Sequence, residues 1–549
     1  MDYNYLAELL FPNITTLPAE FEEKYPPRIL PEGAKVTRFA PSPTGFVHFG
    51  SLFPVLVSER LAHQSGGVFY LRIEDTDSKR EVVGAETDII RAYAAFGIAF
   101  DEGVTLDGEH GDYGPYRQSE RTHIYQTYAK QLVREGKAYP CFCTAEELDA
   151  IRQEQESIKA VTGYYGPWAK YRDAGIKEIE ALLKDGEPFV LRFRSEGSSA
   201  RKIKFKDLVR GSIEITENDI DHVLLKSDGV PTYHFAHAVD DHLMRTTHVV
   251  RGEEWLSSLP FHLQLFSALG FKPPKYLHIA QLMKKEGDSK KKLSKRDNSA
   301  ALSYYRGAGY ISECVVEYVM TLLNSNYEEW RMANPDADLD EFKFSVGKMS
   351  ASGSLFDFDK LNDVSKNTLS RLSAEKVYSY ALDYAQEFDP SFAQVLKSDP
   401  DYAKRILAIG RGGKKPRKDL TVMRDVKPYM SFFYDEYFAL ETDYPEGFDK
   451  KDIRDALSRF IDAFDIADTQ EVWFEKIKEI SSELGFCPEV KLYKKNPTAY
   501  KGHVGDVCMF LRIAITGRTN SPDIYEVMQI LGADRVKARI FAEIQRLAG

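Results

Sequence analysis

The chain has 549 residues, 43% of them hydrophobic and 12% aromatic, which is enough to build several packed domains. Its 73 basic and 84 acidic residues give a net charge of −11, which excludes a protein that coats nucleic acid with its whole surface but allows local basic patches. No apolar run approaches the length of a membrane span, so we expect no membrane partner.

Residues 1–33 are expected to form an irregular extension. They hold five prolines, six acids and, as basic residues, only Lys24 and Arg28, unlike an Arg-rich transit peptide or an apolar secretory signal. The five cysteines of the chain are too sparse and odd in number for a disulfide scaffold, which favours a reducing compartment. We therefore expect a cytoplasmic protein.

Residues 34–115 have the pattern of a strand–helix–strand unit. "AKVTRFA" and "VFYLRIEDTD" predict strands, and "SLFPVLVSERLAHQSGG" predicts a helix that Ser51 caps and that Gly66 and Gly67 end. Because a crossover helix joins parallel neighbours, the sheet is predicted to be parallel.

Residues 116–219 differ in texture and predict an α+β insertion. Thr144 and Glu147 form a capping-box pattern, and "PFVLRFRSEG" and "GSIEIT" predict short strands. The strand pattern returns over 220–300, in "DHVLLKSDGVPTYHFAHAVDDH" and "THVVRGEEWLSS", so the interrupted sheet would be completed there. Beyond about residue 300, helical periodicity dominates to Gly549.

The loop "TRFAPSPTGFVHFGS", at 37–51, lies between the first predicted strand and helix. Gly45 and Gly50 would let backbone approach a ligand, His48 can donate to phosphate oxygens, and the helix N-terminus favours an anion. The loop fits neither a P-loop, since Ser51 stands where lysine is needed, nor the dinucleotide fingerprint. Taken alone, a proline-stiffened turn with a structural histidine explains it equally well.

A second basic element favours a phosphate site. "KKEGDSKKKLSKR", at 284–296, has seven basic residues and two acids and follows a predicted strand, "KYLHIAQLM". A lysine loop at the same sheet edge as His48 would clamp a triphosphate and stabilise charge in phosphoryl chemistry.

These motifs resemble the two signatures of class I aminoacyl-tRNA synthetases, in the form found in bacterial-type glutamyl-tRNA synthetases. "RFAPSPTGFVHFGS" is similar to the first signature and "KLSKR" to the second. Further similar segments follow in the family's order, from the catalytic part to the C-terminus: "LRIEDTD", "GPYRQSER", "YPCFCT", "DLVRGSI", "LLKSDGVPTYHFAHAVDDHLM", "HVVRGEEWLSSLP", "LRIAITGR" and "GADRVKARI".

The resemblance implies a fold and a division into domains. The class is α/β, with a Rossmann-type parallel-sheet catalytic domain, an α+β insertion and an all-helical C-terminal anticodon-binding half. The expected parts are an N-terminal extension (1–33), the catalytic halves (34–115 and 220–300), an acceptor-binding insertion (116–219), a stem-contact region (301–375) and an anticodon-binding region (376–549).

Two departures from the family pattern bear on function. Ser51 replaces the second histidine of the first signature, which members of the glutamyl branch often lack as well. Cys141 and Cys143 match the first pair of a zinc site, but "YYGPWAKYR" supplies no later cysteine or histidine. Two thiolates do not complete a tetrahedral site, so we predict no structural zinc and no other metal held by the protein alone.

The resemblance implies glutamate as substrate, which needs cations for two carboxylates and an acid for the ammonium. Arginine binds carboxylates with paired donors. The alternative for either arginine is a structural ion pair with an acid such as Asp75 or Glu253. The implied glutamate contacts are Arg38, Ala40, Ser42, Glu74, Tyr233 and Arg251.

The implied chemistry joins the glutamate carboxylate to the α-phosphate of ATP, releases pyrophosphate with Mg²⁺, and then passes the acyl group to tRNA. No side chain need act as a nucleophile, because positioning and charge stabilisation carry the rate. The catalytic residues implied are His48, Lys292 and Lys295, and the ATP contacts are His48, Gly50, Glu254, Trp255, Lys292 and Lys295.

His237 is more ambiguous. It lies four residues after Tyr233 and would either tune recognition of the amino acid's head group or pack as a strand histidine, the reading we slightly favour.

The expected partners are tRNA(Glu), L-glutamate and ATP, for a monomeric enzyme. "RGGKKPRK" would meet the phosphates of the anticodon arm through Arg411, Lys414, Lys415, Arg417 and Lys418; without the resemblance it is a solvated loop.

Three alternatives stay open at this point. One is a related enzyme that glutamylates queuosine in tRNA, a type that lacks the anticodon-binding half. The second is a non-catalytic tRNA-binding paralogue. A glutamine-specific enzyme fits less well, because "RFPPEPNG" would stand at the first signature and β-barrels at the C-terminus.

Overall fold

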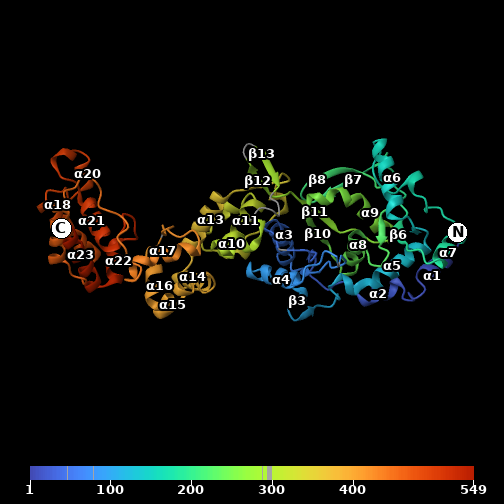
Figure 1. Cartoon of the computed structure of the whole chain (residues 1–549), viewed down its shortest axis with the longest axis horizontal. Coiled ribbons are helices and arrows are strands. Elements are labelled where there is room, and N and C mark those ends of the chain that lie inside the picture. The colour runs from blue at the N-terminus through green and yellow to red at the C-terminus, as the bar shows by residue number, and fades with distance from the viewer. Residues whose placement is uncertain (46, 78, 287–288, 293–299, 414, 549) are drawn as a thin grey trace. The chain divides into compact units, whose positions relative to one another are not determined.

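A computed structural model of the chain describes residues 1–45, 47–77, 79–286, 289–292, 300–413 and 415–548 (Figure 1). These residues divide into two compact units. The first comprises Met1–Tyr304 and Val316–Asp357, and the second comprises Tyr305–Val315 and Phe358–Gly549. None of the helices in the described ranges is both long enough and apolar enough to cross a bilayer.

The N-terminal extension is helical, so the prediction of irregular structure is wrong. It forms α1 (Tyr3–Leu10) and α2 (Pro18–Lys24), and both helices pack against α5 (Thr122–Arg134). Proline starts α2, a position where the missing N–H costs nothing, and Leu6 and Leu10 are buried at helical spacing. Five prolines therefore bound the helices instead of excluding them.

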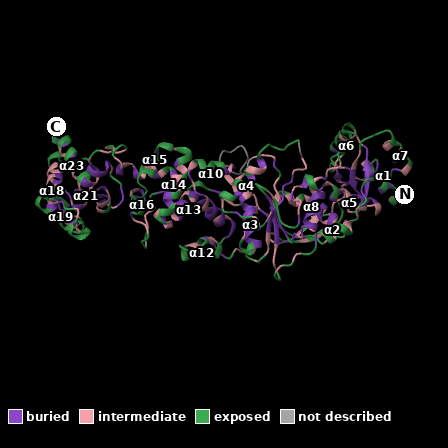
Figure 2. Cartoon of the chain, turned by 90° about the horizontal axis from the view of Figure 1, so that it is seen from below, coloured by how far each residue is buried: buried purple, intermediate pink, exposed green. Residues whose placement is uncertain are grey.

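The strand–helix–strand prediction is confirmed. Strands β1 (Val36–Phe39) and β2 (Val68–Leu71) pair in parallel, with α3 (Leu52–His63) between them in the chain. All of α3 from Leu52 to Ala62 except Pro54 is buried, as Figure 2 shows in purple. Strand β3 (Glu102–Thr105) adds in parallel and β4 (Gly108–His110) adds antiparallel at the edge, so the sheet is mixed. Helix α4 (Ala85–Ala95) lies between β2 and β3 in the chain.

The end of α3 matches the sequence prediction and its start does not. Gly66 takes a left-handed φ of +66°, and the Gly67 N–H donates to the carbonyl of Ala62, which closes the helix. Ser51, the predicted cap, already has helical backbone angles, because a 3₁₀ turn (Phe49–Ser51) precedes the helix. Its hydroxyl instead lies 2.6 Å from the hydroxyl of Tyr93.

The insertion contains its own antiparallel sheet. Strands β5 (Ala138–Cys141), β6 (Val190–Phe193) and β9 (Val223–Leu225) pair side by side, and β7 (Lys202–Asp207) and β8 (Gly211–Thr216) form a separate hairpin. Helices α6 (Ala145–Ser157) and α7 (Ile176–Lys184) belong to this segment, and the predicted capping box at Thr144 and Glu147 is confirmed. Since β9 pairs with β6, the insertion's sheet continues past residue 219.

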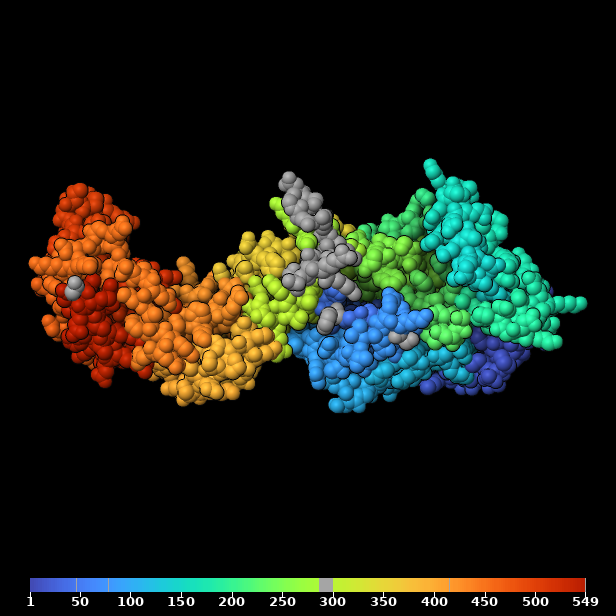
Figure 3. Space-filling view, in the orientation of Figure 1, coloured from blue at the N-terminus to red at the C-terminus, as the bar shows by residue number. Residues whose placement is uncertain are grey.

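The segment at 220–300 returns beside the first sheet and forms a two-stranded sheet there. It contains α8 (Tyr233–Leu243), β10 (His248–Gly252), α9 (Leu259–Ala268) and β11 (Lys275–Ile279), with β10 and β11 parallel. Strand β10 lies beside β1, where the Thr247 N–H donates to the Val36 carbonyl at 2.9 Å. The blue and green segments therefore adjoin in the space-filling view (Figure 3).

A hairpin follows β11. Strand β12 (Met283–Glu286) pairs antiparallel with β13 (Ser289–Lys292) and parallel with β14 (Leu355–Phe356). The lysine loop predicted at 284–296 thus begins on this hairpin, and its residues from 293 onward lie outside the described ranges.

The chain beyond residue 300 is helical, as predicted. Apart from β14, its regular elements in the described residues are α helices and short 3₁₀ turns. A large core that includes Phe433, Leu457, Phe510 and Ile540 fills the second unit. The α helices are α10 (Leu302–Ala308), α11 (Ser312–Leu323), α12 (Tyr327–Ala333), α13 (Phe358–Arg371), α14 (Ala374–Phe388), α15 (Pro390–Ser398), α16 (Pro400–Ala408), α17 (Val426–Met430), α18 (Lys450–Ala463), α19 (Gln470–Glu483), α20 (Val490–Tyr493), α21 (Val504–Thr516), α22 (Ile524–Leu531) and α23 (Ala533–Ala548).

Candidate functional site

The loop at 37–51 is fixed at its base by Phe49. This side chain is fully buried, with its ring centroid 5.2 Å from that of Phe356. The backbone around His48 forms an isolated bridge with Ala301, and the Val47 carbonyl accepts from Leu302 N–H. Space around Gly45 and Gly50 is open, since an added Cβ at either would meet no atom within 4 Å. A ligand can therefore approach this backbone closely.

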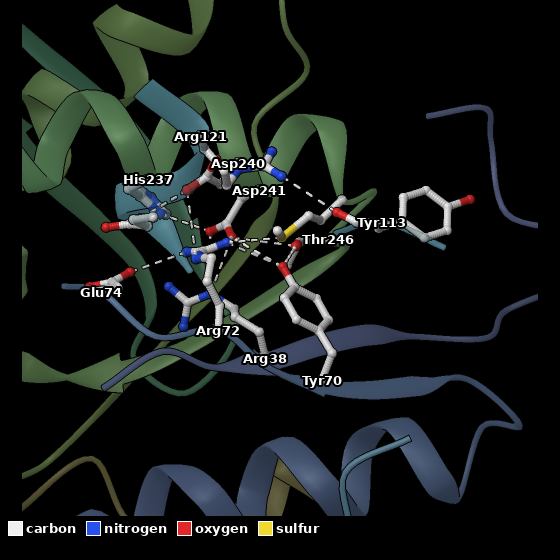
Figure 4. A network of polar contacts seen from close by, with 12 residues as sticks. Arg38, Tyr70, Arg72, Glu74, Tyr113, Arg121, His237, Asp240, Asp241 and Thr246 are labelled. Carbon is white, nitrogen blue, oxygen red and sulfur yellow. Dashed lines mark hydrogen bonds and ion pairs between the residues drawn. The ribbon is translucent and has the colours of Figure 1, made fainter. Parts of the chain in front are cut away.

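A buried network of charges lies at the carboxyl ends of β1 and β2 (Figure 4). Arg38, on β1, pairs with Asp241 of α8 at 3.2 Å. Arg72, directly after β2, donates to the same carboxylate at 2.7 Å and to Glu74 at 3.2 Å. Two guanidinium groups therefore share Asp241, and Arg72 links this carboxylate to Glu74.

A second carboxylate of α8 anchors the insertion side of the site. Asp240 accepts from Arg121 at 2.7 Å, from Gln118 at 2.9 Å and from the Tyr125 hydroxyl at 2.8 Å. Arg121 and Asp240 are fully buried. Arg72 contacts both acids, since its Nε lies 3.8 Å from Asp240, and the Tyr125 bond ties α8 to α5.

The ionisation of two acids in the network differs. The pKa of Glu74 rises to about 7, chiefly because burial disfavours its charged form, while Arg72 and Arg38 oppose the rise. The pKa of Asp241 stays well below its usual range, because Arg38 and Arg72 outweigh the effect of burial. Asp241 is therefore a fixed anion, whereas Glu74 titrates near neutral pH.

Arg251, on β10, is buried but has a different kind of partner. Its Nε donates to His278 Nε2 at 2.9 Å, and its Nη1 lies 3.0 Å from His262 Nδ1. The guanidinium also stacks over the Tyr276 ring, 4.6 Å from the centroid. Among the described residues, no carboxylate pairs with it. The alternative of a structural ion pair thus holds for Arg38, through Asp241, and finds no partner for Arg251.

Tyr233 lies between these groups. It begins α8, and its ring packs 4.3 Å from Trp255 and 5.8 Å from His237, centroid to centroid. Burial raises the pKa of Tyr233, Glu74 adds to the rise, and Arg251 and Arg38 oppose it. Four of the predicted glutamate contacts, Arg38, Glu74, Tyr233 and Arg251, are therefore electrostatic neighbours.

The other two predicted contacts lie on the loop. The Glu74 N–H donates to the Pro41 carbonyl at 3.0 Å, which places Ala40 and Ser42 beside the acid. Ser42 is exposed and Ala40 is half-buried.

His237 lies on a helix, so its assignment to a strand is wrong. It is fully buried on α8, with Nε2 2.9 Å from the Tyr276 hydroxyl and Nδ1 2.7 Å from Asp241. Burial lowers the pKa of His237 to about 4. "YHFAHAVDDH" carries apolar residues at helical as well as alternating positions, and only packing decides between them.

The residues predicted to contact ATP are partly described. Trp255 is half-buried beside Tyr233, and Glu254 is exposed and accepts from Gln281 at 3.2 Å. Glu253, its neighbour, pairs with Arg210 of the insertion. Lys292 ends β13, and Lys295 lies outside the described residues.

The basic loop of the second unit separates into anchored and exposed residues. Arg411 donates to the carbonyls of Leu407 and Leu372, and Arg417 holds Asp419 with two bonds. Lys415 and Lys418 are exposed, and Lys414 lies outside the described residues.

Cys141 and Cys143 lie near Tyr164, whose hydroxyl is 3.6 Å from the sulfur of Cys143. Within the part of the chain that the structure describes, no group of three or more His, Cys, Asp or Glu side chains is placed to hold a metal ion.

Sequence reasoning did not single out several residues of the site. Arg72, Asp207, Asp240, Asp241 and His278 stand inside quoted segments and His262 stands outside them. Their contacts became visible only in the structure.

Comparisons with known proteins identify the family of the chain. Residues 35–363 match the family model "tRNA synthetases class I (E and Q), catalytic domain", and residues 387–544 match an anticodon binding domain. These matches make the chain a class I aminoacyl-tRNA synthetase. Within that class, the chain belongs to the family of synthetases for glutamate (E) and glutamine (Q).

The similar proteins extend over the whole chain. A glutamate–tRNA ligase of Acetivibrio thermocellus is 51% identical, with 98% of this chain and 99% of the relative covered. One of Clostridium perfringens is 48% identical, with 98% and 100% covered. The crystal structure of a glutamate tRNA ligase from Elizabethkingia meningosepticum, in complex with its amino acid, is 30% identical with a TM-score of 0.71 and covers 93% of this chain and 99% of its own.

Proposed function

We propose that the chain is an ATP-dependent glutamate–tRNA ligase, which forms glutamyl-adenylate and then glutamyl-tRNA, with AMP and diphosphate as products. The observation that carries this conclusion is Arg251, a buried cation with no carboxylate partner among the described residues. Tyr233 is an electrostatic neighbour of Arg251, Arg38 and Glu74. This set supplies cations for two carboxylates and an acid for an ammonium. The relatives named above as glutamate–tRNA ligases support the same reaction.

Each group of the glutamate substrate would be bound by a different residue. Arg251 would receive the side-chain carboxylate of glutamate, and Arg38 would neighbour it. Glu74 would hold the ammonium, with Tyr233 and Ser42 adding hydrogen bonds and Ala40 lining the loop. Binding the ammonium would lower the pKa of Glu74 from about 7, because a cation favours the charged carboxylate.

ATP would lie against the loop that holds Gly45 and Gly50. His48 and Gly50 would meet the phosphate and adenosine side, Lys292 and Lys295 the phosphates, and Glu254 and Trp255 the adenosine. Mg²⁺ binds through phosphates with few protein ligands, so we expect it to arrive on ATP, where it would neutralise the departing diphosphate.

The second unit would bind the tRNA anticodon arm. Among the described residues of the loop, Lys415 and Lys418 are exposed lysines, and we assign phosphate contacts to these two and Lys414, while Arg411 and Arg417 would hold the loop's shape. The domain scheme proposed is that of the sequence: 34–115 and 220–300 catalytic, 116–219 acceptor-binding, 301–375 stem-contact and 376–549 anticodon-binding. We propose a cytoplasmic monomer.

The test is ATP–pyrophosphate exchange with purified protein. Exchange that requires both L-glutamate and glutamate tRNA supports the proposal. No exchange under any condition would contradict it and favour a non-catalytic tRNA-binding paralogue. Glutamylation of queuosine alone would favour the second enzyme type, although the anticodon-domain match argues against it.

A further inference from the structure

The two histidines that hold Arg251 must act as acceptors, because a guanidinium only donates. Nε2 of His278 accepts from Arg251 Nε, so the proton of His278 must be on Nδ1. This Nδ1 lies 2.7 Å from Asp207 Oδ2, an ideal distance for donation to a carboxylate. His278 and Asp207 are both buried. The arginine and the aspartate thus fix one tautomer of His278 between them.

The second histidine follows the same logic. Nδ1 of His262 accepts from Arg251, so its Nε2–H is directed to His234 Nδ1, at 2.8 Å. Burial lowers the pKa values of His262 and His278, which keeps both rings neutral at pH 7. Two neutral acceptors orient Arg251 without cancelling its charge. A carboxylate in their place would neutralise the guanidinium and compete with the anion it binds.

Asp207 is positioned by backbone of the turn between β7 and β8. Its Oδ1 accepts from the N–H groups of Val209 and Arg210, both at 2.9 Å, and its Oδ2 accepts from His278. Arg210 also pairs with Glu253, just after β10. The motif "DLVRGSI" of the insertion therefore contacts the strands beside Arg251 through Asp207 and Arg210. The proposed ATP and glutamate contacts assign no function to this motif.

We infer that Asp207 and His278 are specificity-determining positioning residues: Asp207 holds His278 in the tautomer that accepts from Arg251, and this keeps Arg251 oriented as a cation for an anionic substrate side chain. The inference deepens the proposed function and rests on it. The competing explanation is that Asp207 and His278 only hold the β7–β8 turn against the sheet and have no effect on substrate preference.

The sharpest variant is Asp207→Asn, which keeps volume and shape. The two turn N–H groups retain the amide oxygen at the Oδ1 position, so the NH₂ group takes the Oδ2 position. There it faces His278 Nδ1 and also the His278 backbone N–H, which donates to Oδ2 at 3.2 Å in the wild type. This donor forces the proton of His278 to Nε2, where it opposes the N–H of Arg251. An asparagine at the equivalent position of a histidine–carboxylate pair is known to select the wrong tautomer.

His278→Leu removes the acceptor, and His278→Gln keeps one that can reach Arg251. His248→Leu is the matched control, since His248 is also a buried histidine of this sheet but its ring contacts Thr247. The assay is tRNA-dependent ATP–pyrophosphate exchange, with kcat and KM for L-glutamate and L-glutamine, and the inhibition constant of L-glutamine where turnover is too slow.

We expect Asp207→Asn and His278→Leu to lower the preference for glutamate about tenfold or more, through KM for glutamate more than through kcat. His278→Gln should retain most of the preference, and in Asp207→Asn a second change, His278→Gln, should restore part of it, because the Gln amide can turn. His248→Leu should leave the preference unchanged.

Two results overturn the inference while leaving the proposed function intact. One is an unchanged glutamate preference in Asp207→Asn and His278→Leu while wild type is active. The other is an equal fall for both amino acids through kcat. If Asp207→Asn does not fold, the glutamate preferences of His278→Leu and His278→Gln still test the inference, because only the second variant keeps an acceptor for Arg251. Wild-type protein without glutamate-dependent exchange would instead refute the proposed function.

Discussion

Glu74→Gln tests the most unusual acid of the site. Glu74 is buried beside Arg72, and its pKa lies near 7 instead of 4.5. We propose that its carboxylate holds the ammonium of glutamate, which only the ionised form can do. In the wild type, kcat/KM for glutamate should therefore fall about tenfold for each pH unit below 7 and level off above it. In Glu74→Gln this step should disappear.

The size of the loss follows from the bond that is removed. A hydrogen bond between charged groups contributes roughly 1.5–3 kcal/mol, so kcat/KM for glutamate at pH 8 should fall about 10- to 150-fold in Glu74→Gln. The isosteric amide keeps the packing and an acceptor for Arg72. The measurement is the pH profile of glutamate-dependent exchange from pH 5.5 to 8.5.

Folding stability should depend on pH with the opposite sign to kcat/KM, because ionisation of Glu74 favours activity and disfavours the folded state. For an acid whose folded pKa is raised, the folded state holds the proton between pH 4.5 and 7 while the unfolded state has lost it. The contribution of Glu74 to stability therefore declines as pH rises through this window, by about 3 kcal/mol in all. Glu74→Gln lacks this decline, so its melting temperature relative to wild type should rise between pH 5 and pH 8.

Glu59→Gln is the matched control. Glu59, on α3, is also buried with its pKa raised by burial, but its charged neighbours are Arg60, His63, Asp340 and Asp101, which lie outside the proposed glutamate contacts. The Glu59→Gln variant should change the pH dependence of folding stability and leave the pH profile of kcat/KM for glutamate unchanged. A wild-type profile that is flat from pH 5.5 to 8.5, or a Glu74→Gln profile that keeps the step, would refute the assigned role of Glu74.

Three further predictions concern the rest of the site. Arg251→Gln should lower the preference for glutamate over glutamine by roughly 2–5 kcal/mol, measured as the ratio of the two kcat/KM values, because the amide offers no charge for the anion. A constant ratio with both values lowered would make Arg251 structural. Lys295→Ala should raise the barrier to adenylate formation by about 3 kcal/mol with little effect on glutamate binding, and normal single-turnover formation would remove the lysine from the mechanism. Purified protein should carry no stoichiometric zinc, since Cys141 and Cys143 lack partners at ligand spacing; one tightly bound zinc per chain, lost on mutating Cys141, would contradict this.

Local patterns of the sequence predicted the elements that carry the site. The strand, loop and helix around Gly45 and Gly50, the end of α3 at Gly66, and the capping box at Thr144 follow from residues within a few positions of one another. Where two local signals competed, the sequence misled: prolines suggested irregular structure at 1–33, and mixed periodicity hid the helix that holds His237. Packing decides such cases, because propensity is weak beside burial.

Sequence alone determined the family motifs, the chemical types at the site and the helical nature of the second unit. Only the tertiary structure decided which charges face each other. Arg38 and Asp241 are 203 positions apart, Arg72 and Asp241 169, and Asp207 and His278 71. Such pairs depend on the order of strands in the sheet and on the helix packed against their ends, which nearest-neighbour rules do not encode. For the same reason, the sequence could mark Arg251 as a cation but could not show that its buried partners are histidines and not carboxylates.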